Sequence, residues 1–252
     1  MKKYLIVFVA FILLIPAFAY SDLFTFRVGY FIPRASMDSD LWQIEFENMD
    51  FKKSDFQDTV FSFSYEYFMN NQFSLILSLD SYNKKKMGIY TDYVSDIVDD
   101  EAFAFDYGQG NPISHIFTVS QTPISIGLKI TPMGRRGGVI PYVGGAASLI
   151  LFTVRIQGDM VDFSDPVEFW DVQREEWVIG YPVIPTDARV DNKLAFGWNV
   201  FGGVMFPIAN RISIEGEFKY FVGSGDISDT FVDFTNHDLS GYQITIGVNY
   251  WF

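Results

Sequence analysis

Apolar and polar residues alternate with a period of two along much of this chain. The final stretch, residues 242–252, carries Tyr, Ile, Val and Phe at its even positions and mostly Gln, Thr, Gly and Asn at its odd positions. Neighbouring side chains of a strand point to opposite faces, so this alternation predicts a strand with one apolar and one polar face. An additional stretch, residues 139–154, is apolar on both faces, and its phase is therefore not fixed. The predicted strands are residues 24–32, 61–67, 73–79, 124–130, 139–154, 194–204, 212–220 and 242–252.

The connections between these strands alternate in length. Three are short, at residues 70–72, 132–137 and 207–210, and four are long, at residues 33–58, 83–114, 155–192 and 223–239. Barrels of the bacterial outer membrane have an even number of antiparallel strands, with short turns at one end and long loops at the other. The pattern therefore predicts an all-β fold, an eight-stranded antiparallel up-and-down transmembrane β-barrel.

Alternation alone does not decide which face of the strands meets the surroundings. A soluble lipocalin-like barrel would point its apolar face inward, around a ligand cavity. Here the polar face consists mostly of small uncharged residues, which suits a narrow interior better than a surface in water. The apolar face ends in aromatic residues, as in the interfacial girdles of membrane barrels; these are Tyr65, Tyr67, Phe206, Tyr220 and Tyr250. We therefore favour the membrane barrel and keep the soluble binder as an alternative.

The first residues have the composition of a secretory signal peptide. Lys2 and Lys3 precede an apolar run at residues 4–15, and small residues suitable for cleavage follow at Ala17 and Ala19. The run is too short for a spanning helix, which needs about 20 residues. We expect a signal peptide at residues 1–19 and a mature barrel domain at residues 20–252, located in the bacterial outer membrane.

Charge and cysteine content exclude several classes of function. Without Lys2 and Lys3, the 18 basic residues become 16 against 31 acidic ones, a net charge of −15. Nucleic acid is therefore not an expected partner, because binding phosphates requires a basic face. The chain has no Cys, which excludes disulfides, thiolate metal sites and a Cys nucleophile.

The last twelve residues, Gly241-Tyr-Gln-Ile-Thr-Ile-Gly-Val-Asn-Tyr-Trp-Phe252, carry a resemblance to a known family. A final alternating strand that ends on Phe is similar to those of the small outer-membrane β-barrel superfamily that includes outer membrane proteins A, W and X. The resemblance implies that Tyr250 and Phe252 belong to the signal read by the barrel-assembly machinery, which is then a partner. The long loops match no motif of a subfamily, so the specific activity stays open.

Charged residues occupy several positions on the predicted inward face. The interior of an eight-stranded barrel is just wide enough for side chains, and isolated charge there would be destabilising. We therefore expect these residues to form a hydrogen-bonded plug, with a path for ions or solutes as the alternative. The predicted polar network of the lumen is Arg27, Glu66, Asp80, Lys129, Glu215, Glu217 and Lys219.

Four aromatic residues lie among carboxylates in the long connection at residues 155–192. They are Phe163, Phe169, Trp170 and Trp177. Aromatic residues in an exposed loop are candidate contacts for an extracellular ligand or surface. They would equally serve to fold the loop onto the rim of the barrel, and the sequence leaves both roles open.

Catalysis requires a general base, and the chain has two histidines, His115 and His237, both near predicted loop–strand junctions. Ser114 precedes His115 and Asp238 follows His237, which neither supports nor forbids a catalytic dyad in space. We expect no catalytic residue, no metal and no cofactor. The expected function is a non-enzymatic structural or surface-binding protein surrounded by outer-membrane lipid. The alternatives are a narrow channel for small or hydrophobic solutes, a lipid A-modifying enzyme and the soluble lipocalin-like binder.

Overall fold

Strands make up most of the protein. The computed structural model describes residues 22–36, 40–106, 110–135, 137–171, 174–231 and 234–252, so the predicted signal peptide lies outside the described residues. In this part of the chain, no helix has the length and apolar character needed to cross a membrane. The main strands are β1 Leu23–Pro33, β2 Asp58–Phe68, β3 Phe73–Val98, β5 Asn111–Ile130, β6 Ile140–Val161, β8 Glu176–Ala209, β9 Ile212–Gly225 and β11 Gly241–Trp251.

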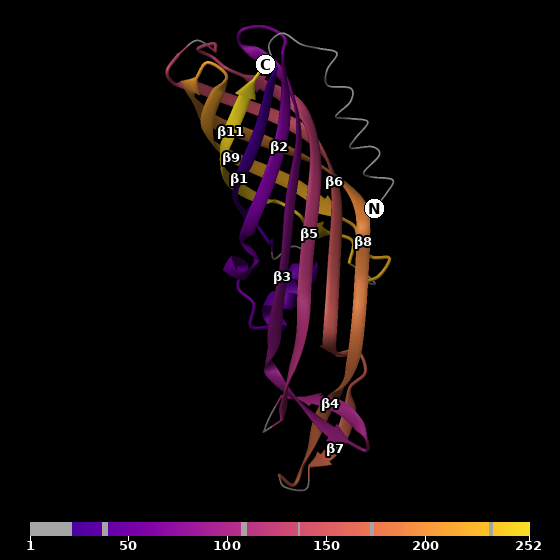
Figure 1. Ribbon diagram of the computed structural model, residues 1–252. Coiled ribbons are helices and arrows are strands. Elements are labelled where there is room, and N and C mark those ends of the chain that lie inside the picture. Colours follow the sequence, from indigo (N-terminus) through magenta and orange to yellow (C-terminus); the bar gives the residue numbers. More distant parts are fainter. Residues whose placement is uncertain (1–21, 37–39, 107–109, 136, 172–173, 232–233) are drawn as a thin grey trace.

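These eight strands form a closed antiparallel ring. Each pairs with the next in the order β1, β2, β3, β5, β6, β8, β9 and β11. The ring closes because β11 pairs with β1 from Leu23↔Trp251 to Pro33↔Gly241. Closure satisfies the backbone groups that an open sheet would leave at its edges. The predicted eight-stranded barrel is confirmed, and Figure 1 shows its strands rising together toward the end that carries the C-terminus.

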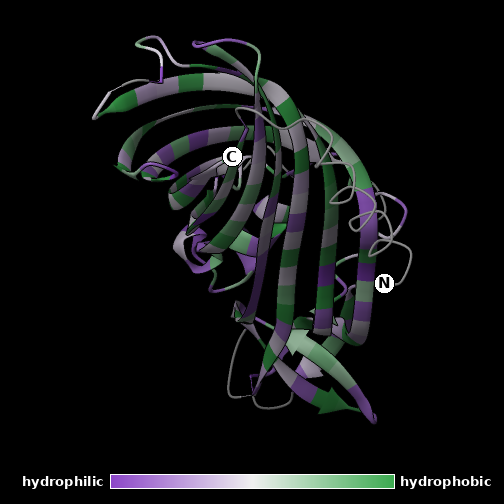
Figure 2. Cartoon of the chain, turned by 45° about the horizontal axis from the view of Figure 1, so that its top comes forward, coloured by the Kyte–Doolittle hydropathy of each residue, from purple (hydrophilic) through white to green (hydrophobic). Residues whose placement is uncertain are grey.

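The faces of this barrel are arranged for a membrane rather than for water. Large apolar side chains project outward: Ile246 is 69 % exposed and Ile126 is 55 % exposed. Polar side chains such as Arg27 and Asn199 point inward and are buried. Figure 2 shows the alternation as successive green and purple bands along the strands. A soluble barrel would have the opposite arrangement, so the ring is a transmembrane barrel.

Four strands continue well beyond the apolar outer surface. Residues 83–114 and 155–192, predicted to be long loops, lie largely in β3, β5, β6 and β8, and this prediction was wrong. Outside the membrane a strand needs no apolar outer face, so the alternation that identified the other strands is lost here. We call residues 87–120 and 156–188 the extension.

Two shorter strands complete the extension at the end opposite the C-terminus (Figure 1). β4 Glu101–Phe105 pairs with both β3 and β8, which closes a second, smaller ring through β3, β4, β8, β6 and β5. β7 Val167–Asp171 pairs with the start of β8. The extension is therefore a sheet continuous with the barrel wall, not a set of separate loops.

The connection at residues 33–58 folds into the lumen. It contains the helix α2 Asp40–Asn48 and the short 3-10 helix η2 Lys53–Phe56. Trp42 and Phe56 from this connection are buried in one apolar cluster with the inward-facing Phe31 and Phe117. We call residues 40–56 the plug segment.

The plug segment also explains why residues 139–154 are apolar on both faces. Ile150, Phe152 and Val154 of β6 point inward into the same apolar cluster as the plug segment. Val143 and Leu149 lie on the opposite face, toward the membrane. The expectation of a polar lumen therefore holds for the half of the barrel nearer the short turns and fails for the other half.

The connection at residues 223–239 contributes one more strand. β10 His237–Asp238 pairs with the end of β9, and the main-chain N–H of Leu239 donates to the carbonyl of Gly223 at 3.0 Å. This pairing places His237 and Asp238 beside the plug segment, where the indole Nε1 of Trp42 donates to the main-chain oxygen of Asp238 at 2.9 Å.

Candidate functional site

The seven charged residues predicted for the lumen all lie there, and the structure pairs them. Lys129 Nζ lies 2.7 Å from Glu66 Oε2, and Lys219 Nζ lies 2.9 Å from Asp80 Oδ2. Lys129 also stands over the ring of Tyr142, with its Nζ 3.9 Å from the ring centroid. Because buried charges need partners, this pairing lets the charges fill the lumen without an isolated ion.

The remaining three residues form the other part of the network. Arg27 donates through Nε to Glu215 and through Nη1 to Ser64 Oγ at 2.9 Å, and its Nη2 lies 3.3 Å from Glu217. Glu217 also accepts from the Tyr142 hydroxyl at 3.1 Å, which links this cluster to Lys129. The lumen at this level is occupied by interlocked side chains.

Toward the extension, the plug segment fills the lumen with aromatic rings. Trp42 makes edge contacts with Phe56 at 4.9 Å and Phe117 at 5.1 Å, and it stacks on His237 at 5.4 Å between ring centroids. The ionic network and this aromatic cluster occupy successive levels of the barrel. Any path along the axis would have to pass both.

Both histidines of the chain hold the plug segment. His115 Nε2 lies 2.8 Å from Glu45 Oε2, and both side chains are buried. Within the described part of the chain, neither ring nitrogen of His237 has a hydrogen-bond partner. Burial lowers the pKa of His237 to about 4, so the ring is neutral at pH 7. The arrangement positions the histidines as packing partners of α2.

The four aromatic residues predicted as loop contacts divide into two pairs. Phe163 packs against Tyr93 and Tyr181, each at 5.1 Å between ring centroids. Phe169 packs against Phe103 at 4.8 Å, inside the extension. These two phenylalanines therefore hold the extension together.

The two tryptophans project from the same hairpin. Trp170 of β7 and Trp177 of β8 are directly opposite each other, with ring centroids 5.6 Å apart. They are 50 % and 65 % exposed, and the neighbouring Ile179 is 49 % exposed. We call Trp170, Trp177 and Ile179 the tip patch. Sequence reasoning named the tryptophans but missed Ile179, which alternation with the buried Val178 would have placed on the same face.

The tip patch lies in a strongly acidic part of the molecule. The two segments of the extension contain 14 Asp and Glu residues and a single basic residue, Arg174. Arg174 lies 3.7 Å from Asp171 and 3.8 Å from Glu176, which flank the tryptophans. Among the described residues, no three carboxylates or histidines come together in a group that could hold a metal ion.

The predicted assembly residues lie at the end of β11. Tyr250 faces outward, and the exposed ring of Phe252 meets it edge-on at 5.2 Å. The main-chain N–H of Phe252 donates to the Asp22 carbonyl at 3.0 Å, which fixes the end of the chain beside the start of β1. Recognition of these residues by the assembly machinery stays a prediction.

Comparison with known proteins gives solved structures but no relative by sequence. No protein-family model matches the chain, and no curated protein matches it. The similar solved structures are small outer-membrane and surface barrel proteins. Neisserial surface protein A has a TM-score of 0.45 at 13 % identity, covering 92 % of this chain and 97 % of that one.

Two further structures are similar to the same degree. OprG, an outer membrane protein from Pseudomonas aeruginosa, has a TM-score of 0.45 at 12 % identity over 92 % of this chain and 96 % of that one. Ail, the attachment invasion locus protein of Yersinia pestis, in complex with a heparin analogue, has a TM-score of 0.41 at 12 % identity over 92 % and 97 %. Because these TM-scores are below 0.5, we assign the fold from the closed ring of strands and not from the comparison.

Proposed function

We propose that this protein is a non-enzymatic binding protein of the bacterial outer membrane. In this proposal the barrel anchors the extension, the extension projects outside the cell, and the tip patch contacts a ligand there. The observation that carries the proposal is the tip patch itself. Two exposed tryptophans and an isoleucine gather at the far end of the extension, whereas Phe103 and Phe105 of the same sheet are buried. Exposed apolar groups of this kind are typical of contact sites, and Trp is enriched among residues that dominate binding energy.

The filled lumen favours anchoring over transport. A channel needs an open path, but the ionic network around Arg27 and Lys129 and the aromatic cluster around Trp42 occupy the barrel at two levels. The extension is therefore the part of the molecule that is available to bind a ligand.

The charge around the tip patch supports a cationic partner. Asp171 and Glu176 flank the two tryptophans in sequence, and the extension as a whole is strongly acidic. Lys and Arg interact favourably with carboxylates by ion pairing and with indole rings by cation–π contact. We therefore infer that the ligand is a protein surface rich in Lys and Arg. A polyanion such as nucleic acid would be repelled by the 14 acidic residues of the extension.

A binding experiment on whole cells tests this function. Cells that carry the full chain in their outer membrane are incubated with labelled polyarginine, and bound label is measured against salt concentration. The variant Trp170→Ser/Trp177→Ser keeps every charge, and we expect it to bind at least tenfold more weakly. Ile184→Ser, another exposed apolar position on the extension, is the matched control and should bind like the parent.

Two outcomes would contradict the proposal. Equal binding by the tryptophan variant and the parent would mean that polyarginine is attracted by the overall negative charge and that the tip patch does not contribute. A chain that fractionates as a soluble protein, with the same gel mobility before and after boiling, would remove the membrane anchor altogether.

A further inference from the structure

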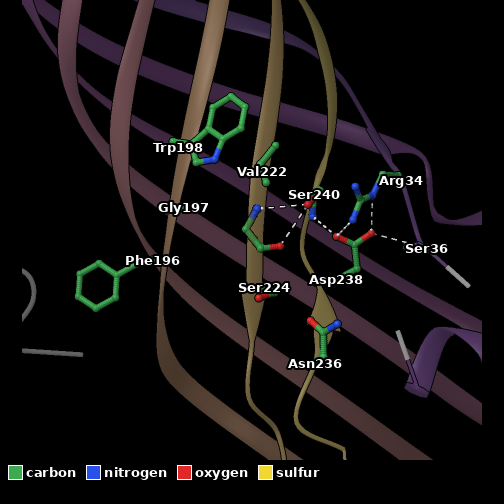
Figure 3. A pocket seen from close by; sticks show the side chains of 11 residues that line it. Arg34, Ser36, Phe196, Gly197, Trp198, Val222, Ser224, Asn236, Asp238 and Ser240 are labelled. Atoms are coloured by element: carbon green, nitrogen blue, oxygen red, sulfur yellow. Dashed lines mark hydrogen bonds and ion pairs between the residues drawn. The ribbon is translucent and has the colours of Figure 1, made fainter. Parts of the chain in front are cut away.

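A groove opens on the outer wall where β8 and β9 separate. Their pairing begins at Gly197↔Gly223, and beyond this point the two strands diverge. The groove has a volume of about 390 Å³. Figure 3 shows Phe196 and Trp198 on one side and Arg34, held by Asp238, on the other.

The cation of this groove is held by a buried carboxylate. Arg34 Nε donates to Asp238 Oδ2 at 3.0 Å, and Arg34 Nη2 donates to Asp238 Oδ1 at 3.1 Å. The Asp238 side chain is only 4 % exposed, whereas that of Arg34 is 45 % exposed. Main-chain N–H groups of Ser36 and Ser240 also donate to Asp238, at 3.0 and 3.1 Å. The face presented to the outside is therefore the guanidinium, in a fixed orientation.

A second cation lies close to Arg34. Lys53 Nζ donates to the main-chain oxygen of Arg34 at 3.4 Å, and its side chain is exposed. The groove thus combines the guanidinium of Arg34 with polar side chains, among them Ser224 and Asn236, while Lys53 lies outside its lining. This chemistry suits an anionic group with several acceptor oxygens, and a guanidinium fork matches the geometry of a phosphate.

The groove lies at the level of the lipid headgroups. Trp198 meets Tyr220 edge-on at 6.3 Å, and Tyr220 stacks on Tyr242 at 4.9 Å. These rings form the border of the apolar outer surface. Trp and Tyr concentrate where a membrane meets water, at the level of the headgroups. Phe196 is 83 % exposed at the same border.

An apolar hollow of about 470 Å³ lies further along the same wall. Phe206, Ile214 and Ile246 line it around Gly216, where an added Cβ would meet no atom within 4 Å. Gly216 precedes Val222 of the first groove by six residues on β9. At about 3.3 Å per residue and a tilt of about 45°, this is a descent of roughly 14 Å. That depth is about half of a hydrocarbon core of about 30 Å, the length available to the chains of one leaflet.

We propose that the two hollows together bind one phosphate-bearing lipid. Its headgroup phosphate contacts the exposed guanidinium of Arg34, and an acyl chain follows β9 down to the notch at Gly216. The site rests on the membrane orientation given under Proposed function, but it is independent of the tip patch and its ligand. It takes its lipid from the leaflet on the side of the extension.

Lipid retention by the full-length barrel, measured by native mass spectrometry, tests the site. The barrel is refolded in an uncharged detergent and titrated with phosphatidylglycerol, and in a parallel arm with inorganic phosphate. We expect one tightly retained phosphatidylglycerol per barrel. Ser224→Asp, which places a negative charge in the groove, and Gly216→Leu, which fills the notch, should each weaken retention at least tenfold.

Two matched variants serve as controls. Ser81→Asp adds the same charge at an exposed position of β3, and Gly145→Leu adds the same side chain to β6, where a Cβ would make only ordinary contacts. Both should retain the lipid like the parent. Equal retention by all four variants would overturn the site and leave only non-specific lipid around the barrel. Binding of inorganic phosphate as tight as that of the lipid, and unchanged by Gly216→Leu, would also overturn it.

A variant that fails to fold into a closed barrel would be detected by a separate measurement. The gel mobility of each unboiled variant reports whether the ring has closed. A folded barrel without lipid retention refutes the lipid site alone, whereas an unfolded chain in the parent would refute the membrane anchor.

Discussion

We expect a lower pH to destabilise the packing of the plug segment, because His237 becomes protonated. The ring of His237 stacks on Trp42, and within the described residues neither of its nitrogens has a hydrogen-bond partner. Protonation would place a positive charge among aromatic rings. The nearest compensating carboxylate, Asp238, is already engaged by Arg34 and by two main-chain N–H groups. On the other face of α2 the titratable groups are Glu45 and His115, which are paired with each other.

The size of the effect follows from the pKa of His237. Burial lowers this pKa to about 4, and a solvent-exposed ring in the opened plug has a pKa of about 6.5. Opening therefore takes up a proton between these values, so the closed plug is most stable above pH of about 6.5 and loses stability as the pH falls toward 4. Between pH 7 and pH 5 the linkage relation gives a loss of about 2 kcal/mol, or roughly 20-fold more frequent opening.

Hydrogen exchange of the α2 amides measures this opening, after correction for the intrinsic rate at each pH. The decisive variant is His237→Phe, which keeps an aromatic ring against Trp42 and removes the titrating group. We expect its plug opening to be nearly independent of pH between 7 and 5. His115→Gln, which retains a donor for Glu45, is the control and should keep the pH dependence of the parent. An unchanged pH dependence in His237→Phe would refute the assignment to this ring.

Three further predictions follow from the barrel. Lys129→Met leaves the Glu66 carboxylate buried without its partner at 2.7 Å, so the free energy of unfolding should fall by about 3–5 kcal/mol, measured by urea unfolding followed by gel shift. If Lys129→Met/Glu66→Met is no more stable than Lys129→Met, the unpaired Glu66 carboxylate is not the cause of the loss. Gly29→Ala should block assembly, because its Cβ would lie 2.0 Å from a main-chain oxygen of β11, whereas Gly216→Ala should change stability by less than about 0.5 kcal/mol; equal yields of folded barrel would contradict this. Trp42→Ala should loosen the plug by about 3–5 kcal/mol yet give no conductance steps in planar bilayers, since the ionic network still fills the lumen; conductance in this variant would refute the two-level seal.

The transmembrane part of the fold was predictable because lipid imposes a strict pattern. Outward side chains in lipid are mostly apolar and inward ones must fit a narrow lumen, so seven of the eight strands were readable from alternation, and residues 139–154 were recognised only as an apolar stretch. The lumen charges were found for the same reason, since a charge on the polar face of such a strand can point only inward.

The extension was not predictable by this route, and β8 shows why. One extra residue near Asn192, whose φ is 50°, shifts the register against β6. Val190 therefore points inward, whereas Leu194, an even position four residues on, points outward. A bulge of one residue exchanges the two faces of a strand, so a period read from residues 194–204 fails on the other side of it. The plug segment was not predicted because the alternation of residues indicated a polar lumen along the whole barrel.

The division of the four aromatic residues needed tertiary structure as well. Phe169 and Trp170 are neighbours on β7 and must face opposite ways, which the sequence could have shown had the strand been recognised. Which face is buried depends on β4, because Phe103 and Phe105 cover Phe169 from a segment far away in sequence. Contacts of this kind leave no local pattern.

Both proposed sites lie on the single strand β8. Trp177 of the tip patch and Trp198 of the lipid groove lie on the same strand, which runs from Glu176 to Ala209. At about 3.3 Å per residue they are roughly 70 Å apart along the chain path. Over most of that length β8 is paired with β6, so the tip patch is carried by hydrogen-bonded sheet rather than by a flexible loop. A rigid support leaves less conformational entropy to be lost when a ligand binds, and the contacts of a small patch can then suffice. The same rigidity requires a wall that does not open, which the paired charges and the plug segment inside the barrel provide.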